Sequence, residues 1–390
     1  MSTVKHKVLV LIGTRPEAIK MAPVIAALRA RNDKFETRVC LSGQHKELLQ
    51  PALDLFNIVP DDDFNIVNEG SGLNFIAQRV ISGVDKVIEK FPANYVLVQG
   101  DTTTSMAASL AAFYRGVAVG HVEAGLRSGR LDAPWPEEAN RRITSIVANL
   151  HFAPTEGARA ILLREGVEDS SIFVTGNTVV DALLDVATRI NEDQEFLAKL
   201  RNQTTYLDAS KKLVLVTGHR RESFGEGFRR ICEAIAHLAK RDDTQVVYPV
   251  HLNPMVRGPV HTLLGGLKNV SLVDPVSYEI FVYLMMQSSL ILTDSGGVQE
   301  EAPSLGKRVL VMRDVTERNE GIAAGTTELV GTSLDRIVTR AKAILNSPDN
   351  STVQKLRFRP NPFGDGKAAE RIVSQLDTRS TNAGGRTEPT

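Results

Sequence analysis

Short runs of apolar, mostly β-branched residues recur along the chain, and most end in glycine, aspartate or histidine before a stretch with helical spacing. The runs are KVLVLIG, TRVCLSG, YVLVQGD, VAVGHVEAG, SIFVTGN, LVLVTGH, QVVYPVH, VSLVD, LILTDSGG and RVLVM. Continuous apolar strands that alternate with helices are typical of parallel sheets covered by helices on both faces. The pattern therefore predicts an α/β protein.

The order of these runs also predicts how the chain is divided. Ten strands are many for one open sheet, and residues 188–212 interrupt the rhythm with a charged segment that lacks a strong strand. We expect an interdomain connector there. The two halves restart alike, because VLVLIGTRPE and LVLVTGHRRES both run strand, glycine, polar residue, arginine. This repeat indicates two similar domains with parallel sheets that face each other across a cleft.

Composition limits the classes of partner. The chain has 390 residues, 42% of them hydrophobic, and 46 basic residues balance 46 acidic ones. Nothing therefore indicates nucleic acid or an anionic membrane, and any anionic ligand must be held by local positive groups. Cys40 and Cys232 form no disulfide framework and have no metal-ligand spacing. The first apolar run is too short for a signal peptide or a spanning helix, so we expect a cytoplasmic protein.

Basic side chains follow several strands, where ligands of parallel sheets bind. Arg15 follows the first strand and Arg318 a late one, and either guanidinium could fork onto a diphosphate. His219 and Arg220 follow the first strand of the second half, where a histidine could donate to a phosphate oxygen or move a proton. The alternatives are solvated loop arginines and a histidine bonded to a loop carbonyl. Lys20 lies one turn inside the first helix and is more ambiguous.

The segment TDSGGVQEEAPSLGK follows a strand and opens a helix. Ser295, Gly296 and Gly297 would direct backbone N–H groups at an anion, and Glu301, one turn on, could accept from a ribose hydroxyl. The alternative is that Asp294 or Ser295 merely caps the helix and the glycines permit a tight turn.

Acidic residues follow neighbouring strands. Asp101 precedes a helix, so it is either a cap or a catalytic acid. Glu123 precedes Gly125 and has no helix to cap. Glu137 and Glu138 follow Pro136 at a helix start, where the helix dipole alone would explain them. Acids from three loops at one strand-end rim are nevertheless typical of proton transfer.

Other patterns concern the nucleotide. Phe281 is predicted on a helix, where it either stacks on a base or packs in the core. Neither GSGLNF nor GEGFRR is a dinucleotide-binding fingerprint after a strand, and the chain has no P-loop sequence. Cationic groups in both halves and a glycine-rich helix start together favour a nucleotide diphosphate.

These motifs occur together in a known family. The relevant segments are GTRPEAIKMAPVI, GDTTTSMAASLAAFY, GHVEAGLRSG, PWPEEANRR, FVTGNTVVDAL, VTGHRRESFGEGF, YPVHLNPMVR, LTDSGGVQEEAPSLGK, VLVMRDVTER and NPFGDG. Over residues 7 to 376 the chain resembles the bacterial non-hydrolysing UDP-N-acetylglucosamine 2-epimerases. The resemblance implies interconversion of UDP-N-acetylglucosamine and UDP-N-acetylmannosamine without a redox cofactor or a metal.

The resemblance also implies an architecture. The family is similar in fold to the two-domain GT-B glycosyltransferases, so two Rossmann-like domains are expected. The N-terminal α/β domain would cover 1–178, and a C-terminal helix at about 362–378 would join it. A nucleotide-binding domain would cover 179–361. The polar tail 379–390 is expected to be disordered, and a homodimer is the family expectation.

Matching the motifs residue by residue implies individual roles. The catalytic group implied by the resemblance is Asp101, Glu123, Glu137 and His219. The residues implied to bind or support the UDP-sugar are Arg15, Lys20, Arg141, Val276, Phe281, Ser295, Gly296, Gly297, Glu301 and Arg318. Some relatives bind a second substrate molecule as an activator, for which Gln44, His45 and Arg220 match, whereas the basic partner expected near residues 68–74 is missing. Asn319 also stands where the family usually has proline.

The same motifs suggest three alternative functions. A GT-B glycosyltransferase would use the same nucleotide site but would need an acceptor and would not act on C2 of the sugar. An enzyme that epimerises a modified UDP-sugar is a variant of the 2-epimerase hypothesis. A nucleotide-sugar-binding protein without catalysis is disfavoured by the retained acids.

Overall fold

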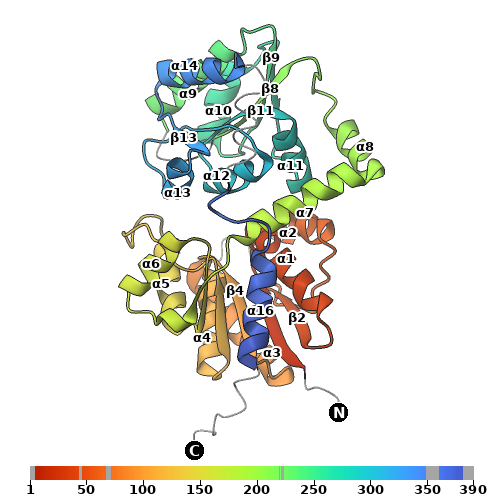
Figure 1. Cartoon of the computed structure of the whole chain (residues 1–390), viewed down its shortest axis with the longest axis vertical. Helices are drawn as coiled ribbons and strands as arrows, with labels where there is room; N and C mark the ends of the chain where they lie inside the picture. The colour runs from red at the N-terminus through yellow and green to blue at the C-terminus, as the bar shows by residue number, and fades with distance from the viewer. Residues whose placement is uncertain are drawn as a thin grey trace, which may run out of the picture. The chain divides into compact units, whose positions relative to one another are not determined.

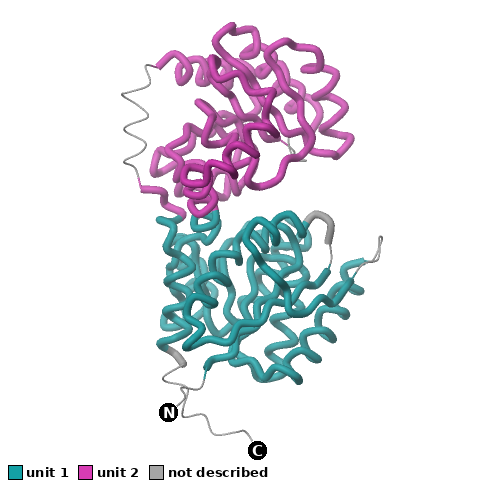
Figure 2. The backbone as a smooth tube through the Cα atoms, turned by 90° about the vertical axis from the view of Figure 1, so that its right-hand side faces the viewer, with its two compact units in different colours: residues 1–182, 364–390 teal, residues 183–363 magenta. Residues whose placement is uncertain are grey.

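The chain folds into two compact units, which Figure 2 colours separately. The computed structural model describes residues 5–43, 46–66, 72–218, 220, 224–347 and 360–380. Unit 1 contains Met1–Ala182 and Gly364–Thr390, and unit 2 contains Leu183–Phe363. The boundary lies inside helix α7 (Thr178–Glu192). The charged segment 188–212 therefore belongs to unit 2.

In the described part of unit 1, seven parallel strands form one sheet in the order β3-β2-β1-β4-β5-β6-β7. The strands are β1 (His6–Ile12), β2 (Phe35–Leu41), β3 (Asp62–Asp63), β4 (Tyr95–Gln99), β5 (Ala118–Val122), β6 (Leu150–Ala153) and β7 (Ile172–Val174). The order reverses between β1 and β4, which are neighbours although β2 and β3 come between them in sequence. Ligands of open α/β sheets bind beyond the carboxyl ends of strands at such a switch point.

Helices pack on the sheet of unit 1 (Figure 1). They are α1 (Arg15–Ala30), α2 (Lys46–Leu55), α3 (Leu73–Lys90), α4 (Thr103–Tyr114), α5 (Glu137–Val147), α6 (Glu156–Arg164), the start of α7 and α16 (Ala368–Ser380). Helix α16 comes from the end of the chain and packs against α1. Its Ala369 N–H donates to Asp181 Oδ1 at 2.8 Å. The helix ends at Ser380, so it includes the first residues of the predicted tail, and 381–390 lie outside the described residues.

The described part of unit 2 repeats this architecture with a six-stranded parallel sheet in the order β10-β9-β8-β11-β12-β13. Its strands are β8 (Lys212–Thr217), β9 (Thr244–Pro249), β10 (Val270–Val273), β11 (Ser288–Thr293), β12 (Val309–Val311) and β13 (Thr327–Leu329). Its helices are α8 (Gln194–Gln203), α9 (Glu226–Leu238), α10 (Pro254–Leu264), α11 (Tyr278–Gln287), α12 (Gly296–Glu301), α13 (Asn319–Ala323) and α14 (Leu334–Leu345). The order reverses between β8 and β11.

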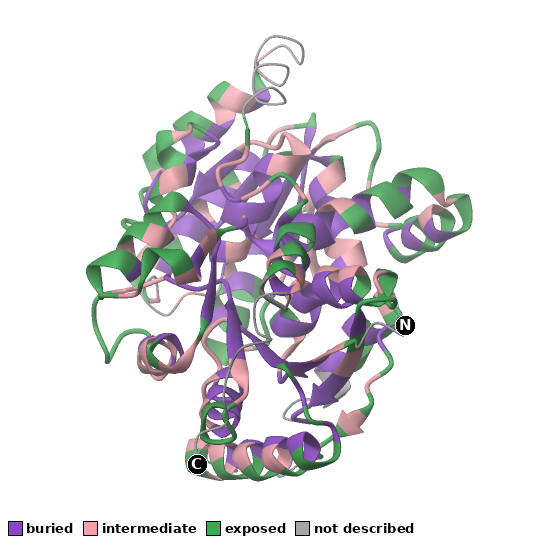
Figure 3. Cartoon of the chain, turned by 60° about the horizontal axis from the view of Figure 1, so that its bottom comes forward, coloured by how far each residue is buried: buried purple, intermediate pink, exposed green. Residues whose placement is uncertain are grey.

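The strands of both sheets are buried between helices (Figure 3). Five consecutive residues of β1, Val8 to Ile12, are almost completely buried, and so are Leu213 to Val216 in β8. Burial on both faces removes the alternation of polar and apolar positions, which is why these strands read as continuous apolar runs. Among the described residues, none of the helices has both the length and the apolar character needed to cross a membrane.

The predicted fold class is confirmed. All ten predicted strands are present, whereas β3, β6 and β13 were not predicted. These three strands have only two to four residues, and two of them are rich in polar side chains. For β3 and β13, pairing with a neighbouring strand, rather than their own hydrophobicity, makes them part of the sheets.

Candidate active site

Three predicted site residues of unit 1 lie at the carboxyl ends of adjacent strands. Arg15 begins α1 after β1, Asp101 follows β4, and Glu123 follows β5. The strands are neighbours in the order β1-β4-β5, so these loops share one edge of the sheet. Arg15 is itself the first residue of α1, and Pro16 is the second.

Glu123 is held in an unusual conformation by a ring of donors. Its φ of 65° lies in the left-handed region, which costs a residue other than glycine about 1–2 kcal/mol. Lys20 Nζ donates to Glu123 Oε2 at 2.6 Å, and Gln99 Nε2 donates to the same oxygen. Asn177 Nδ2 donates to Oε1 at 3.3 Å. A strained backbone with a buried, fully oriented carboxylate is typical of a functional position.

Lys20, whose role the sequence left ambiguous, is the cationic partner of Glu123. Its ion pair with Glu123 is largely buried, with 16% and 6% of the two side chains exposed. Gln99 and Asn177 are buried as well. We did not predict these two as site residues, because an amide in an apolar run or a turn gives no signal of its partner.

Asp101 is paired with α5 rather than acting as a helix cap. Arg141 Nη2 lies 2.6 Å from Asp101 Oδ2, and Asn140 Nδ2 donates to the backbone oxygen of Asp101 at 2.9 Å. The cap of α4 is Thr102, whose hydroxyl accepts from Ser105 N–H at 3.0 Å. The alternative that Asp101 caps α4 is therefore wrong. Its carboxylate remains 29% exposed, and thus open to a ligand.

The two acids at the start of α5 differ sharply. Glu138 is completely buried. Its carboxylate accepts hydrogen bonds from Ser128 N–H at 2.9 Å, Arg142 Nε at 3.2 Å and Arg141 Nη1 at 3.3 Å. Burial opposes ionisation of Glu138, but these donors outweigh it and lower its pKa. Glu137 is half-buried, and its Oε2 accepts no hydrogen bond within the described structure. Glu138 is thus structural, while Glu137 keeps an unsatisfied oxygen.

His121, on β5, supports the loop that carries Asp101. Its Nε2 lies 2.8 Å from the carbonyl oxygen of Gly100, to which it donates. Burial lowers the pKa of His121 to about 4, so the ring is neutral near pH 7.

In unit 2, predicted phosphate-binding residues meet after β11. Ser295 is the N-cap residue of α12, but among the described residues its side chain forms no capping hydrogen bond. Arg318 comes from the loop after β12, and its Nε donates to buried Glu300 Oε1 at 2.8 Å. A Cβ on Gly296 would lie 2.9 Å from Arg318 Cζ. Glycine at 296 therefore lets the guanidinium lie against the start of α12.

The nucleoside-binding candidates lie beside the same helix. Glu301, on α12, accepts from the Tyr278 hydroxyl at 2.7 Å, and both side chains are buried. Phe281 is half-buried on α11, and Val276 lies in the loop before it. Gly297 follows Gly296 in the first turn of α12.

The remaining predicted site residues are Arg220 and three residues that the structure does not describe. Arg220 follows β8, and its N–H donates to Asp294 Oδ2 at 2.8 Å. The predicted catalytic residue His219 and the predicted regulatory residues Gln44 and His45 lie outside the described residues.

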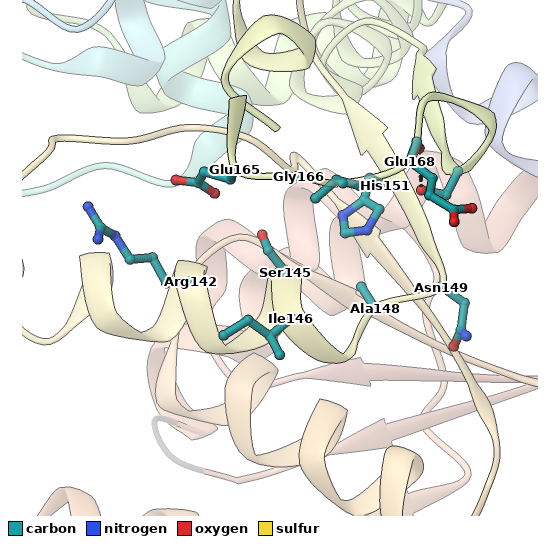
Figure 4. A pocket seen from close by; sticks show the side chains of 11 residues that line it. Arg142, Ser145, Ile146, Ala148, Asn149, His151, Glu165, Gly166 and Glu168 are labelled. Atoms are coloured by element: carbon teal, nitrogen blue, oxygen red, sulfur yellow. Dashed lines mark hydrogen bonds between the residues drawn. The ribbon is translucent and has the colours of Figure 1, made fainter. Parts of the chain in front are cut away.

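Unit 1 also contains a cavity of about 610 Å³ at the opposite ends of its strands (Figure 4). Ala148 and Asn149, which precede β6, line it together with Arg142 of α5, His151 and Glu165. None of the predicted catalytic or substrate-binding residues that the structure describes lines this cavity. The candidate active site is therefore the polar edge at the carboxyl ends of the strands.

Comparisons with known proteins agree on one family. Residues 26–377 match the family described as UDP-N-acetylglucosamine 2-epimerase. The chain is 54% identical to the UDP-N-acetylglucosamine 2-epimerases of Yersinia pestis and Escherichia coli K12, over 95% of this chain and 98% of each relative.

Solved structures point the same way. A UDP-GlcNAc 2-epimerase from Neisseria meningitidis, bound to UDP-GlcNAc, is 46% identical with a TM-score of 0.87, and the match covers 95% of this chain and 99% of that one. A glycosyltransferase from Rickettsia africae, 15% identical with a TM-score of 0.65, covers 98% of this chain and 100% of its own and shares the fold alone. The chain belongs to the UDP-N-acetylglucosamine 2-epimerase family.

Proposed function

We propose that this protein interconverts UDP-N-acetylglucosamine and UDP-N-acetylmannosamine by inverting C2 of the sugar. The observation that carries the proposal is the pair of carboxylates at adjacent strand ends, Asp101 and Glu123, each held by a cation of its own. Family membership at 54% identity over almost the whole chain supports the same reaction.

The chemistry explains why carboxylates are needed. The C2 proton has no neighbouring carbonyl to acidify it, so simple deprotonation would be very slow. If a carboxylate takes that proton while the C1–O bond breaks, the electron pair of the C–H bond forms the C1–C2 double bond. The pair of the C1–O bond leaves with UDP. The products are a neutral glycal and free UDP.

The reverse step sets the new configuration. A second acid protonates C2 from the opposite face, and a diphosphate oxygen of UDP adds back to C1. Proton donors and acceptors are thus required on both faces of the sugar, together with groups that stabilise the leaving diphosphate. Asp101, Glu123 and Glu137 supply the proton-transfer groups in this proposal, without an assignment of each to one face.

The remaining residues have binding roles in the proposal. Lys20 and Arg141 hold Glu123 and Asp101 in place. The diphosphate is bound by Arg15, His219, Ser295, Gly296, Gly297 and Arg318. Glu301 accepts from a ribose hydroxyl, and Phe281 and the backbone at Val276 contact the uracil. The same family assignment favours a cytoplasmic homodimer that supplies N-acetylmannosamine units for a bacterial surface polysaccharide.

Incubation with UDP-N-acetylglucosamine in heavy water tests the reaction. Deuterium at C2, together with the manno epimer, is the expected result, and nuclear magnetic resonance measures both. A glycosyltransferase would leave C2 unlabelled. An unchanged, unlabelled UDP-sugar contradicts the proposal.

Asp101→Asn and Glu123→Gln test the roles of the two carboxylates. Each variant should lose about 10²- to 10⁴-fold in turnover, the usual contribution of a general acid or base, while UDP still binds. Calorimetric titration with UDP provides the second measurement. Loss of UDP binding in both variants would mean that these acids are structural.

A further inference from the structure

The loop that carries Asp101 is anchored at four consecutive residues by three different elements. Gln99 donates to Glu123, and the Gly100 carbonyl accepts from His121, both on the β5 side. Asp101 is held by Asn140 and Arg141 of α5. The fourth anchor is Thr102, whose hydroxyl donates to Glu17 of α1 at 2.7 Å.

Glu17 connects this loop to the turn after β1. Its Oε2 accepts from Gly13 N–H at 3.0 Å, and its Oε1 accepts from the Thr102 hydroxyl. Gly13 comes two residues before Arg15, and Thr102 follows Asp101 directly. One carboxylate therefore spans the two loops that begin on either side of the switch point between β1 and β4.

A helix-capping role does not account for this arrangement. Glu17 is the third residue of α1, where a carboxylate commonly reaches back to backbone N–H groups at the helix start. Its bond to Gly13 belongs to that kind of contact. The bond to Thr102 does not, because Thr102 lies 85 residues further along the chain.

The burial of Glu17 is a second indication that its carboxyl group has a specific role. Glu17 is 1% exposed, and burial raises its pKa to about 7 against the opposing effect of its hydrogen bonds. A buried carboxyl group destabilises the fold unless its partners compensate. An apolar or amide side chain would avoid this cost.

We propose that Glu17 is a positioning residue for the epimerisation: its carboxylate sets the distance between the Arg15 turn and the Asp101 loop. The proposal rests on the proposed function, since it concerns the acid–base step of that reaction. Glu17 does not contact the sugar in this scheme. It acts through Thr102 on Asp101 and through Gly13 on the start of α1.

The test compares Glu17→Gln and Thr102→Val, alone and together, with Glu156→Gln as a matched control. Glu156 is also a first-turn acid of a unit 1 helix, but its side chain is 77% exposed. Steady-state epimerisation gives kcat and KM, and calorimetry gives the dissociation constant of UDP. Each single variant should lose about 10- to 100-fold in kcat, as expected for a small misplacement of a reacting group, with UDP affinity nearly unchanged.

The double variant distinguishes positioning from general structural damage. If Glu17 and Thr102 act as one unit, adding Glu17→Gln to Thr102→Val causes no further loss in kcat. Thr102→Ser, which keeps the hydroxyl, should recover most of the activity lost in Thr102→Val. Wild-type kcat in Glu17→Gln, or losses that multiply in the double variant, would overturn the proposal.

Amide hydrogen exchange of residues 99–106 provides a readout that does not depend on turnover. Exchange should be faster in Glu17→Gln and Thr102→Val than in the wild type and in Glu156→Gln. Unchanged exchange in both variants would contradict the anchoring role even if the wild-type protein proved not to be an epimerase. Absence of epimerisation by the wild type alone would instead contradict the proposed function.

Discussion

Replacement of Glu17 by glutamine should change how the stability of the protein depends on pH. Burial raises the pKa of this carboxyl from 4.5 to about 7 in the folded protein. Each tenfold change in an ionisation equilibrium corresponds to about 1.4 kcal/mol, so the shift corresponds to about 3 kcal/mol. The folded state binds the proton more tightly than the unfolded chain does. Tighter proton binding by folded Glu17 therefore adds to the free energy of unfolding. This contribution is fully present below pH 4.5 and is lost as the pH rises to about 7.

Urea unfolding at a series of pH values measures this effect as a difference between two proteins. Groups other than Glu17 titrate in both, so the difference in unfolding free energy between wild type and Glu17→Gln isolates the one carboxyl. From about pH 5 to about pH 8 the wild type should lose about 2 to 3 kcal/mol relative to the variant. The variant Glu156→Gln, which removes an exposed first-turn acid, serves as the control. If the difference in unfolding free energy between the two proteins stays constant across this range, the reasoning is refuted. Glu17 would then have the same pKa in the folded and the unfolded state.

Three further predictions concern other parts of the structure. Gly296→Ala should weaken UDP binding about 10- to 100-fold in calorimetry because its Cβ would displace the Arg318 guanidinium, whereas Gly227→Ala, whose Cβ would meet Thr332 at an ordinary 3.4 Å, should not. Lys20→Met should reduce the unfolding free energy by about 3 kcal/mol because it leaves Glu123 without its buried cation, and adding Glu123→Gln should restore part of that loss. Burial raises the pKa of the Cys232 thiol to about 12 and that of Cys40 further, so neither should react with a thiol reagent at about pH 8 until urea unfolds the chain.

The fold was predictable where a strand lies in an uninterrupted apolar run of the sequence. The ten apolar runs all became strands, because burial on both faces requires an apolar side chain at nearly every position. The strand Asp62–Asp63 has no such requirement, since it is an edge strand held by pairing with Cys40 and Leu41. Its two aspartates give no signal of a strand in the sequence.

Part of the candidate site was predictable for a similar reason. A polar residue at the end of a strand is visible in the sequence, and this placed Arg15, Asp101 and Glu123 on the strand-end edge. The choice between cap and catalytic acid for Asp101 was not predictable. It depended on whether Asp101 or Thr102 reaches the N–H of Ser105, which is a matter of one residue in the position of the helix start.

The partners of these acids required the strand order, which the sequence pattern does not contain. Lys20 and Glu123 are 103 residues apart, and Glu17 and Thr102 are 85 apart. Once the order β1-β4-β5 is known, both pairings become intelligible. The loop after β4 has the start of α1 on one side and the end of β5 on the other, so a carboxylate at the start of α1 can reach Thr102. The same neighbourhood brings the ammonium of Lys20 to Glu123. The site is thus built by the reversal of strand order rather than by any one motif, and substitutions that leave every motif intact can still disable it by loosening contacts across that reversal.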